Sequence, residues 1–301
     1  MHIVIAGSSG LIGTALVEHL RAADHRVVRL ARVGAGAGAD RDVASWDPAT
    51  GALAADALDG ADAVINLAGA GIGDHRWTDA YRRTLRESRI RSTDLLARTI
   101  AAVERRPSVF VSGSAVGWYG DRGDEELDET SASGSGFLAD LCREWEAATA
   151  PAEAAGVRTV HMRTGVVLSA RGGALKKQLP MFRFGLGGRF GNGKAWQSWI
   201  SIDDDVAVIT HLLTSSLSGP VNVTAPQPVT NREFTKVLSD VLHRPAMLRI
   251  PRFGPRLVLG RDLADALLFT GQRALPTKLV ADGFEFRHPT LEDALEAMLG
   301  D

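Results

Sequence analysis

A glycine-rich turn near the start of the chain constrains its fold more than any other feature. Residues 2–6 are mostly apolar, as in a buried strand, and residues 11–23 have the apolar spacing of a helix. Glycines between such elements allow a tight turn in which backbone N–H groups and the helix N-terminus face an anion. The turn comprises Gly7, Ser8, Ser9, Gly10, Leu11, Ile12 and Gly13. We expect these seven residues to bind the pyrophosphate of a dinucleotide.

The rest of the N-terminal half repeats this alternation of strand and helix. Further strands are predicted at residues 26–30, 63–67, 109–112 and 159–162, and helices at residues 81–103 and 137–155. Such an alternation is typical of βαβ units with parallel strands. The sequence therefore predicts an α/β fold with a doubly wound parallel sheet of the Rossmann type.

The chain changes character after Arg163, where glycine pairs separate short apolar segments. We expect a Rossmann domain over residues 1–163. A second, smaller α/β lobe is predicted over residues 164–199 and 225–301. The segment between these two pieces, residues 200–224, is expected to rejoin the first domain.

Two further patterns support this organisation. The segment 200–213 is predicted to be a helix, with the acidic residues 203–205 at its capped start rather than at a metal site. A short strand is predicted at residues 220–223. Residues 33–39 alternate glycine with small apolar residues, which indicates a flexible loop.

The end of the second predicted strand indicates which dinucleotide binds. NAD sites usually place a carboxylate there to hold the ribose hydroxyls, whereas this chain has Arg32. A guanidinium can hold the 2′-phosphate of NADP(H) by charge-assisted hydrogen bonds, although an exposed surface arginine is the alternative. Leu67, Ala68 and Gly69 follow the next strand of the unit, and their backbone is expected beside the cofactor.

Composition and charge limit the partners. The chain has 34 basic and 36 acidic side chains, so its net charge of −2 predicts no general attraction to nucleic acid or to a membrane. Cys142 is the only cysteine, which is consistent with a reducing, cytoplasmic setting and with an inert buried thiol. The histidines are scattered, so no metal is expected. The expected partner is an unidentified small-molecule substrate, and the protein is expected to be a monomer or a homodimer.

The chain resembles an atypical group of extended short-chain dehydrogenase/reductases, known as the epimerase family or subfamily U and related to nucleotide-sugar epimerases. Beyond the glycine turn, the resemblance rests on Arg76-Trp77, Ser88-Arg89-Ile90-Arg91, Ser114-Ala115-Val116, Tyr119-Gly120, Trp145-Glu146 and the Gly165 to Leu168 run. The resemblance implies an NADP(H)-binding Rossmann domain with Arg32 at the 2′-phosphate. It also implies that Leu67 and Ala68 lie beside the cofactor, that Arg89 reaches it, and that a small family-specific domain begins near Arg249.

The catalytic residues depart from the usual pattern of short-chain dehydrogenases. Those enzymes use a serine together with a tyrosine and a lysine four residues apart, because the lysine lowers the pKa of the phenol that exchanges a proton. Ser114 matches the serine and is expected to donate a hydrogen bond to a substrate carbonyl. The chain has two tyrosines, Tyr81 and Tyr119, and neither is followed by lysine at the fourth position. The usual acid is therefore missing.

Three functions remain open at this point. The first is an NADP(H)-dependent oxidoreductase in which Tyr119, or a carboxylate such as Asp121, replaces the acid, or in which positioning alone supports hydride transfer. The second is a non-catalytic NADPH sensor. The third is a nucleotide-sugar epimerase, which needs the missing base.

Tryptophans in the second half are also candidates for the substrate site. Trp118, Trp196 and Trp199 are expected in loops, where they either form an aromatic wall or pack the lobes together. The glycine-rich segment 185–193, with Arg189 and the nearby Lys194, is expected to cover the cofactor or to bind an anion, or else to be a plain surface loop.

Overall fold

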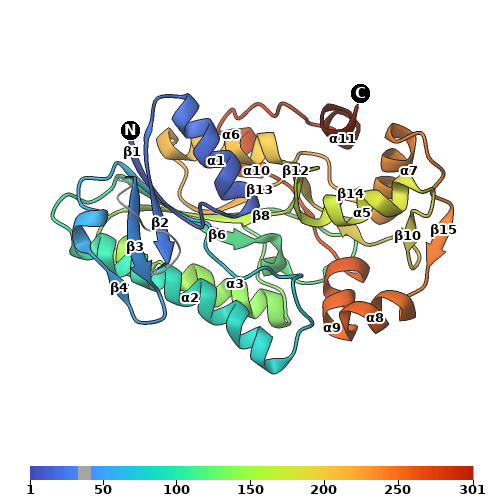
Figure 1. Ribbon diagram of the computed structural model, residues 1–301, viewed down its shortest axis with the longest axis horizontal. Coiled ribbons are helices and arrows are strands. Elements are labelled where there is room, and N and C mark those ends of the chain that lie inside the picture. Colours follow the sequence, from blue (N-terminus) through green and yellow to red (C-terminus); the bar gives the residue numbers. More distant parts are fainter. Residues whose placement is uncertain (33–41, 301) are drawn as a thin grey trace.

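A large, almost entirely parallel sheet lies at the centre of the first lobe in the computed structural model (Figure 1). The structure describes residues 1–32 and 42–300, and within them eight strands form this sheet in the order β13-β8-β6-β5-β1-β2-β3-β4. Their bounds are β1 His2–Ala6, β2 Arg26–Arg32, β3 Val43–Asp47, β4 Ala52–Leu53, β5 Ala63–Asn66, β6 Val109–Ala115, β8 Arg158–Thr164 and β13 Gly219–Val223. The pairings are parallel except between β3 and β4. The predicted loop at residues 33–39 lies outside the described residues.

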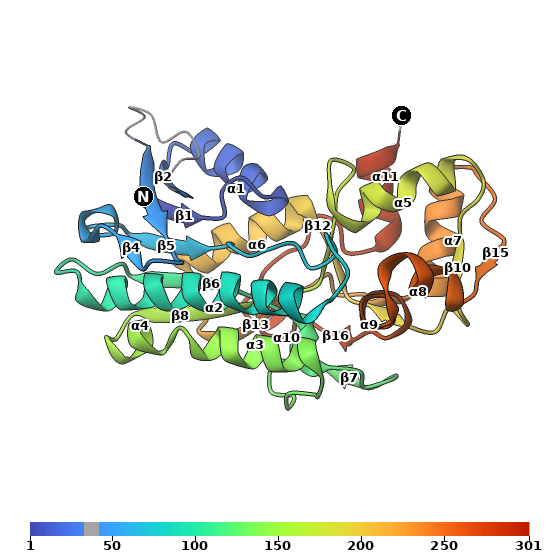
Figure 2. The same ribbon diagram turned by 60° about the horizontal axis from the view of Figure 1, so that its bottom comes forward.

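Helices cover both faces of this sheet, as Figures 1 and 2 show. The bounds of these helices are α1 Leu11–Ala22, α2 Asp79–Ala102, α3 Phe137–Ala147, α4 Ala150–Ala154 and α6 Ile202–Thr214. Ile3 and Ile5 of β1 join the core with α1 and α6, whereas Val4 and Ala6 join the core with α2. Alternate residues of one strand thus face opposite helix layers. The predicted doubly wound α/β fold is confirmed.

The helix predicted at residues 137–155 is wrong in one respect, because two helices occupy this segment. α3 ends at Ala147, and α4 begins at Ala150 with Pro151 in its first turn. Proline lacks the N–H that a continuous helix would need at this position, and its ring clashes with the carbonyl four residues earlier. The break follows from Pro151.

The chain returns to the large sheet after a first excursion into the second lobe. The strand predicted at residues 220–223 is present as β13, which pairs with β8 at the edge of the sheet. Ser201, rather than the acidic residues 203–205, caps the preceding helix α6, because its hydroxyl accepts the N–H of Asp204. The domain boundaries themselves stay a prediction.

The second lobe has its own apolar core around α5, α7 and α11, with Trp199 buried among them. Its helices are α5 Gly173–Arg183, α7 Asn231–Val241, α8 Phe253–Leu259, α9 Arg261–Ala264 and α11 Leu291–Leu299. α10 Thr277–Ala281 packs instead on the first lobe, where Leu279 joins the core with β13. The short helical turns of the described residues are η1 Ala55–Ala57, η2 Val116–Tyr119 and η3 Asp265–Phe269. Short two-stranded sheets connect the lobes and their loops. These strands are β7 Glu126–Leu127, β9 Val166–Leu168, β10 Gly188–Phe190, β11 Trp196–Gln197, β12 Trp199–Ser201, β14 Val229–Thr230, β15 Leu248–Ile250 and β16 Arg273–Ala274. None of the helices in the described part of the chain is long and apolar enough to span a bilayer.

Candidate cofactor and substrate site

The glycine turn packs directly against the loop that follows β5. Gly7 has φ of +80°, and a Cβ at this position would lie 2.5 Å from the carbonyl carbon of Leu67 and 2.7 Å from the backbone nitrogen of Ala68. A Cβ at Gly13 would lie 2.2 Å from the carbonyl oxygen of Gly7. Side chains other than hydrogen are therefore excluded at both glycines. The sequence placed both segments at one cofactor, and the structure brings them into contact.

The N-terminus of α1 opens at this contact. Gly10 is its N-cap and contributes no side-chain cap, so the first turn of the helix has no side chain of its own to accept its N–H groups. Ser8, Ser9, Leu11 and Ile12 complete the turn, and Leu11 also lies against Gly172 of the second lobe. A turn that only glycine fits, next to an uncapped helix N-terminus, fits a pyrophosphate group.

Arg32 is the last residue of β2, next to β1 in the sheet, so it ends at the same edge as the glycine turn. Its side chain is exposed. Asp47 is a carboxylate that interacts with Arg32. The pKa of Asp47 is lowered first by the N–H of Ala49, then by the Thr50 hydroxyl, and to a smaller extent by the positive charge of Arg32. The position of Arg32 agrees with the expected contact to a 2′-phosphate, and that contact stays a prediction.

We expect Arg32→Asp to invert the cofactor preference, because the new carboxylate repels a 2′-phosphate and can accept hydrogen bonds from free ribose hydroxyls. The affinity for NADPH should fall about 10- to 100-fold, as for the loss of one charged hydrogen-bonding pair, while NADH should bind more tightly. Fluorescence titration with both cofactors measures the ratio. Asp47→Asn serves as the control, since it should leave the preference for NADPH in place. An unchanged ratio in Arg32→Asp would remove Arg32 from the cofactor site.

Arg89 of α2 lies beside Gly69, where a Cβ would be 3.2 Å from its guanidinium carbon. The guanidinium also lies 5.1 Å from the centre of the Trp145 ring and donates a hydrogen bond to the carbonyl of Leu85. Burial lowers the pKa of Arg89. The resemblance implies that Arg89 reaches the cofactor; the structure puts it beside the loop after β5, and its contact with the cofactor stays a prediction.

Ser114 belongs to a buried hydrogen-bonded network rather than standing alone. Its hydroxyl donates to Oε1 of Glu146 at 2.7 Å, and Arg163 donates to both carboxylate oxygens of Glu146 at 2.9 Å. Burial alone would lower the pKa of Arg163, but its hydrogen bonds and charge interaction with Glu146 outweigh this and raise it. A hydroxyl has one proton to donate. In this arrangement the oxygen of Ser114 is left as an acceptor, which differs from the expected donation to a carbonyl.

Tyr119 lies in the same network, fully buried in η2. Its hydroxyl donates to Oδ1 of Asn222 at 2.7 Å and accepts a hydrogen bond from Arg163 at 3.2 Å. Burial raises the pKa of Tyr119, although Arg163 opposes the change. The phenol is therefore held among protein groups, and its predicted role as a proton donor is untested.

Glu146, Arg163 and Asn222 were missed as site residues from the sequence. A signal was present for two of them, since Arg163 follows an apolar strand and Glu146 follows Trp145 on the face of α3 that packs against the sheet. Buried charges are rare unless they are paired. The sequence could therefore have identified both residues as candidate buried charges, but it could not predict that they pair between α3 and β8.

The start of α3, where short-chain dehydrogenases carry tyrosine and lysine, holds apolar groups. Phe137 packs edge-on against Trp77, with ring centres 5.1 Å apart. Cys142 is buried as predicted, and burial, followed by the charge of Glu146, raises its pKa to about 11. A thiol with that pKa stays protonated at neutral pH and is a poor nucleophile.

The three tryptophans are held by different partners. Trp199 lies in β12, so its expected place in a loop is wrong. It is fully buried in the core of the second lobe and donates to the carbonyl of Gln227, which agrees with packing and not with a substrate wall. Trp196 lies in β11 and donates to Asp124. Trp118 stacks under the guanidinium of Arg163, 3.9 Å from its ring centre.

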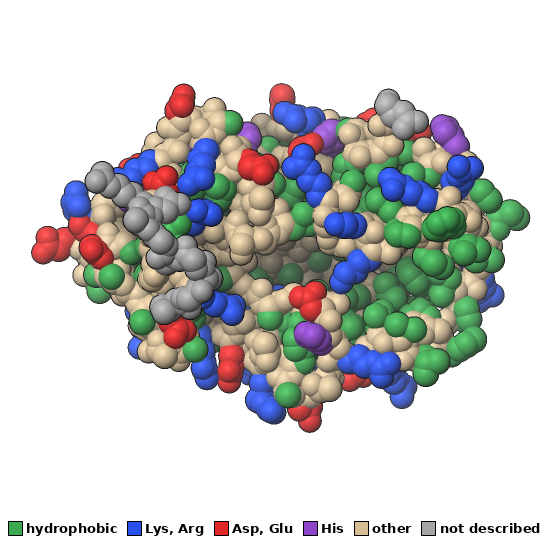
Figure 3. Space-filling view, in the orientation of Figure 1, with side chains coloured by type: hydrophobic (Ala, Val, Ile, Leu, Met, Phe, Trp, Pro, Cys, Tyr) green, Lys and Arg blue, Asp and Glu red, His purple; other side chains and the backbone are tan. Residues whose placement is uncertain are grey.

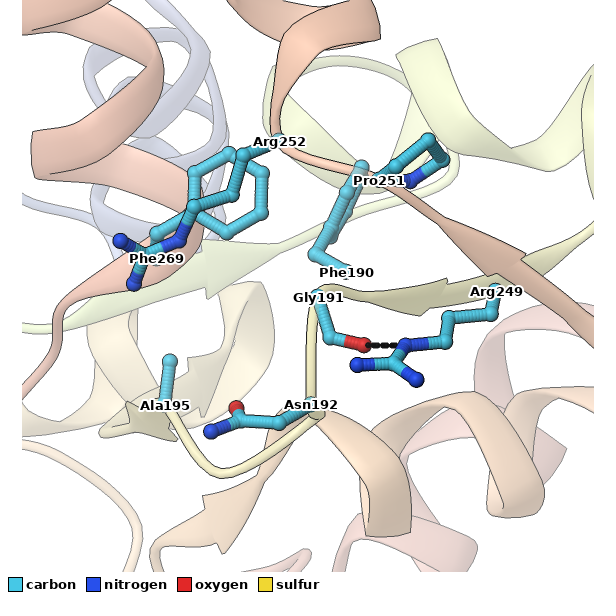
Figure 4. A pocket seen from close by; sticks show the side chains of 8 residues that line it. All are labelled: Phe190, Gly191, Asn192, Ala195, Arg249, Pro251, Arg252 and Phe269. Carbon is cyan, nitrogen blue, oxygen red and sulfur yellow. Dashed lines mark hydrogen bonds between the residues drawn. The ribbon is translucent and has the colours of Figure 1, made fainter.

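A pocket of about 530 Å³ lies in the second lobe, formed by the segment after β10, the end of β15 and η3 (Figure 4). Phe190, Pro251 and Phe269 supply apolar walls, and Arg249 and Arg252 supply positive charge. The glycine turn does not line this pocket. Gln272 follows Phe269 by three residues, and its amide donates a hydrogen bond to the carbonyl of Gly120, next to Tyr119. The predicted glycine-rich cover at 185–193 thus forms β10 and part of this pocket.

Metal ligands are not gathered at this site. Within residues 1–32 and 42–300, no group of three or more histidine, cysteine, aspartate or glutamate side chains is arranged to hold a metal ion. Asp204 instead accepts the backbone N–H groups of Arg287 and His288. The acidic run 203–205 therefore belongs to the start of α6 and its packing.

Two family models match the chain. Residues 3–224 match the NAD dependent epimerase/dehydratase family, and residues 250–298 match a domain of unknown function, DUF1731. Among named relatives, the epimerase family protein ML0860 of Mycobacterium leprae is 44% identical over 294 residues, which cover 97% of this chain and 94% of the relative. A human relative, epimerase family protein SDR39U1, is 35% identical and is covered over its full length.

Solved structures give the same result. The crystal structure of human SDR39U1 with NADPH superposes with a TM-score of 0.88 at 32% identity and covers 99% of both chains. A nucleoside-diphosphate sugar epimerase from Corynebacterium glutamicum superposes with a TM-score of 0.80 at 37% identity. This chain is covered completely in that comparison but spans 58% of the longer Corynebacterium chain.

Proposed function

Since this chain belongs to the NAD dependent epimerase/dehydratase family, we propose that it is an NADP(H)-dependent oxidoreductase acting on a small substrate that carries an anionic group. The observation that carries the proposal is the contact of Gly7 with Leu67 and Ala68, which leaves a turn that only glycine fits beside the N-terminus of α1. NADPH in the crystal structure of the human relative supports the choice of cofactor.

The residues that would hold the cofactor are those of the predicted site. The backbone of the turn from Gly7 to Gly13 would hold the pyrophosphate, Arg32 would pair with the 2′-phosphate, and Leu67 to Gly69 and Arg89 would hold the nicotinamide half. NADPH supplies a hydride when it is bound. The protein contributes binding and orientation of the reacting carbon.

Ser114 orients the substrate in this proposal. Its proton is held by Glu146, so its oxygen accepts a hydrogen bond from a hydroxyl or N–H group of the substrate. Arg163 holds the Glu146 carboxylate in place through hydrogen bonds, and Tyr119 contacts Arg163 from the other side. The pocket with Arg249 and Arg252 would hold the anionic part of the substrate.

A non-catalytic NADPH sensor is the second candidate, and a specific observation favours it. The start of α3 presents Phe137 and the buried Cys142 where an acid is expected, and the phenol of Tyr119 is fully buried. In such a protein the cofactor would stabilise one conformation, which a partner then recognises. A nucleotide-sugar epimerase ranks third, because it needs a base that removes a hydroxyl proton.

Cofactor titration followed by a turnover assay tests the proposal. The purified protein is titrated with NADPH and NADH, and NADPH oxidation is then followed with a panel of carbonyl, enone and imine compounds, with and without an anionic group. Tight NADPH binding and turnover of an anionic compound support the oxidoreductase. Tight binding without turnover of the panel favours the sensor, and absence of binding contradicts both.

Ser114→Ala should lower the hydride-transfer rate about 10- to 100-fold, because the substrate loses one orienting hydrogen bond. NADPH affinity should stay the same, since Ser114 is not part of the glycine turn. Stopped-flow oxidation of bound NADPH measures the step directly. Unchanged turnover in Ser114→Ala would remove Ser114 from the mechanism. Tyr119→Phe is the companion variant. If its hydride-transfer rate has the same pH profile as that of the parent, Tyr119 takes no part in proton transfer.

A further inference from the structure

One end of the second lobe exposes large apolar side chains that lie outside the proposed site. Figure 3 shows hydrophobic side chains gathered over the end of the molecule that carries α5, β15 and α8. We call this region the apolar surface and define it by Phe184, Leu186, Met247, Phe253, Leu257 and Val258. Each of the six is at least half exposed, and Met247 reaches 92%. Contiguous exposed apolar surface of this kind marks an interaction site.

The six residues come from three neighbouring segments. The turn after α5 carries Phe184 and Leu186, and between them Gly185 lies against Pro245, since a Cβ there would be 3.5 Å from the proline ring. β15 pairs with β10 in the same region, and α8 follows β15 after two residues. The segments that carry the six residues are therefore neighbours in space.

The same segments carry positive charge without negative charge. Residues 173–190 contain four lysines and arginines, residues 244–258 contain four arginines, and neither segment contains an acidic residue. The net charge of the whole chain, −2, does not show this uneven distribution of basic residues. A local excess of basic side chains attracts anionic partners even when the net charge is close to zero.

Some of these cations are neutralised and others are not. Arg256 pairs with Asp265, and Arg244 lies in a pocket with Asp240, Glu292 and Glu296. The other six cations of residues 173–190 and 244–258 have no carboxylate within ion-pair distance in the described part of the chain, and these are Lys176, Lys177, Arg183, Arg189, Arg249 and Arg252. Lys176, Lys177 and Arg183 lie in α5 and Arg189 lies in β10, in the segments of the apolar surface or next to them. Arg249 and Arg252 line the proposed substrate pocket and are not counted with this surface.

We infer that the apolar surface binds peripherally to a membrane that contains anionic lipid. Exposed phenylalanine, leucine and methionine side chains enter the interface between headgroups and acyl chains, and flanking arginines and lysines pair with lipid phosphates. A second copy of this chain fits less well, because a two-fold contact would bring the same unpaired cations of both copies together. The charge therefore selects a lipid surface as the partner.

Vesicle co-sedimentation of the full chain tests this inference. We expect binding to vesicles of phosphatidylcholine mixed with phosphatidylglycerol, little binding to phosphatidylcholine alone, and weakening at high salt. The double variant Phe253→Ser/Leu257→Ser should lower the vesicle partition coefficient at least about tenfold, because it removes inserted apolar area. Lys176→Glu/Arg183→Glu should lower it by a similar factor, since each basic residue near an anionic surface contributes about fivefold.

Matched control variants separate the surface from general effects. Arg26→Glu/Arg98→Glu makes the same change of charge on the first lobe, and Val280→Ser removes an exposed apolar side chain elsewhere; both should bind vesicles like the parent. NADPH affinity reports folding in every variant. Equal loss of binding in the controls would overturn the inference. Absence of vesicle binding would also overturn it, and a parent dimer that Phe253→Ser/Leu257→Ser dissociates would assign the surface to self-association.

Discussion

Replacing Glu146 with leucine should lower the free energy of unfolding by about 3–5 kcal/mol. Arg163 is 3% exposed, and its guanidinium donates to both carboxylate oxygens of Glu146. Removal of the carboxylate leaves this cation buried without its counter-charge and takes the acceptor from the Ser114 hydroxyl. Urea denaturation near neutral pH, followed by circular dichroism, measures the change.

The double variant Glu146→Leu/Arg163→Met is the control for this prediction. Replacing a whole buried ion pair by apolar groups of similar size is often neutral or stabilising, whereas removal of one partner is costly. The double variant should therefore be more stable than Glu146→Leu alone. Two results would contradict the prediction: Glu146→Leu as stable as the parent, or the double variant less stable than Glu146→Leu. Either would show that Arg163 does not depend on Glu146 for its charge compensation.

The first lobe could be predicted well because its signals are local. A strand, a glycine turn and a helix follow each other within the first residues of the chain, and this order repeats. The break in the helix predicted at residues 137–155 also has a local signal, since Pro151 interrupts the helix and is visible in the sequence. β3 and β4 were missed because they are short strands at the edge of the sheet, next to residues that carry no strand pattern.

The candidate site was predictable only where neighbouring residues in the chain act together. The glycine turn and the segment Leu67–Gly69 are each a local pattern, so their contact followed from the order of parallel strands. Ser114, Glu146 and Arg163 lie on three different elements, and Asn222 reaches Tyr119 only because β13 returns to the sheet. Their hydrogen bonds depend on tertiary packing, which periodicity does not contain. For the same reason the sequence could not show that the Ser114 hydroxyl donates to Glu146 and not to a substrate carbonyl.

Asp205 is a buried carboxylate without an evident partner. Its side chain is 1% exposed on the face of α6 that packs into the first lobe, and within the described residues its Oδ2 has no hydrogen-bond partner. Burial raises the pKa of Asp205 from 3.8 to about 7. Between these two values the folded protein binds more protons than the unfolded chain, so the free energy of unfolding falls as the pH rises through this window and stays low above it.

Asp205→Leu should therefore stabilise the protein above pH 7 by about 4 kcal/mol more than it does below pH 4, the free energy that corresponds to this difference in pKa. Denaturant midpoints measured across that pH range for the parent and the variant give this difference directly. Asp205→Asn should remove the same pH dependence while keeping a polar side chain. The exposed Asp203 is the matched control, because Asp203→Asn removes a carboxylate from the same turn of α6 and should leave the pH dependence of the parent unchanged. A parent protein whose stability does not fall between these pH values would show that Asp205 is compensated by a group that stabilises its charge.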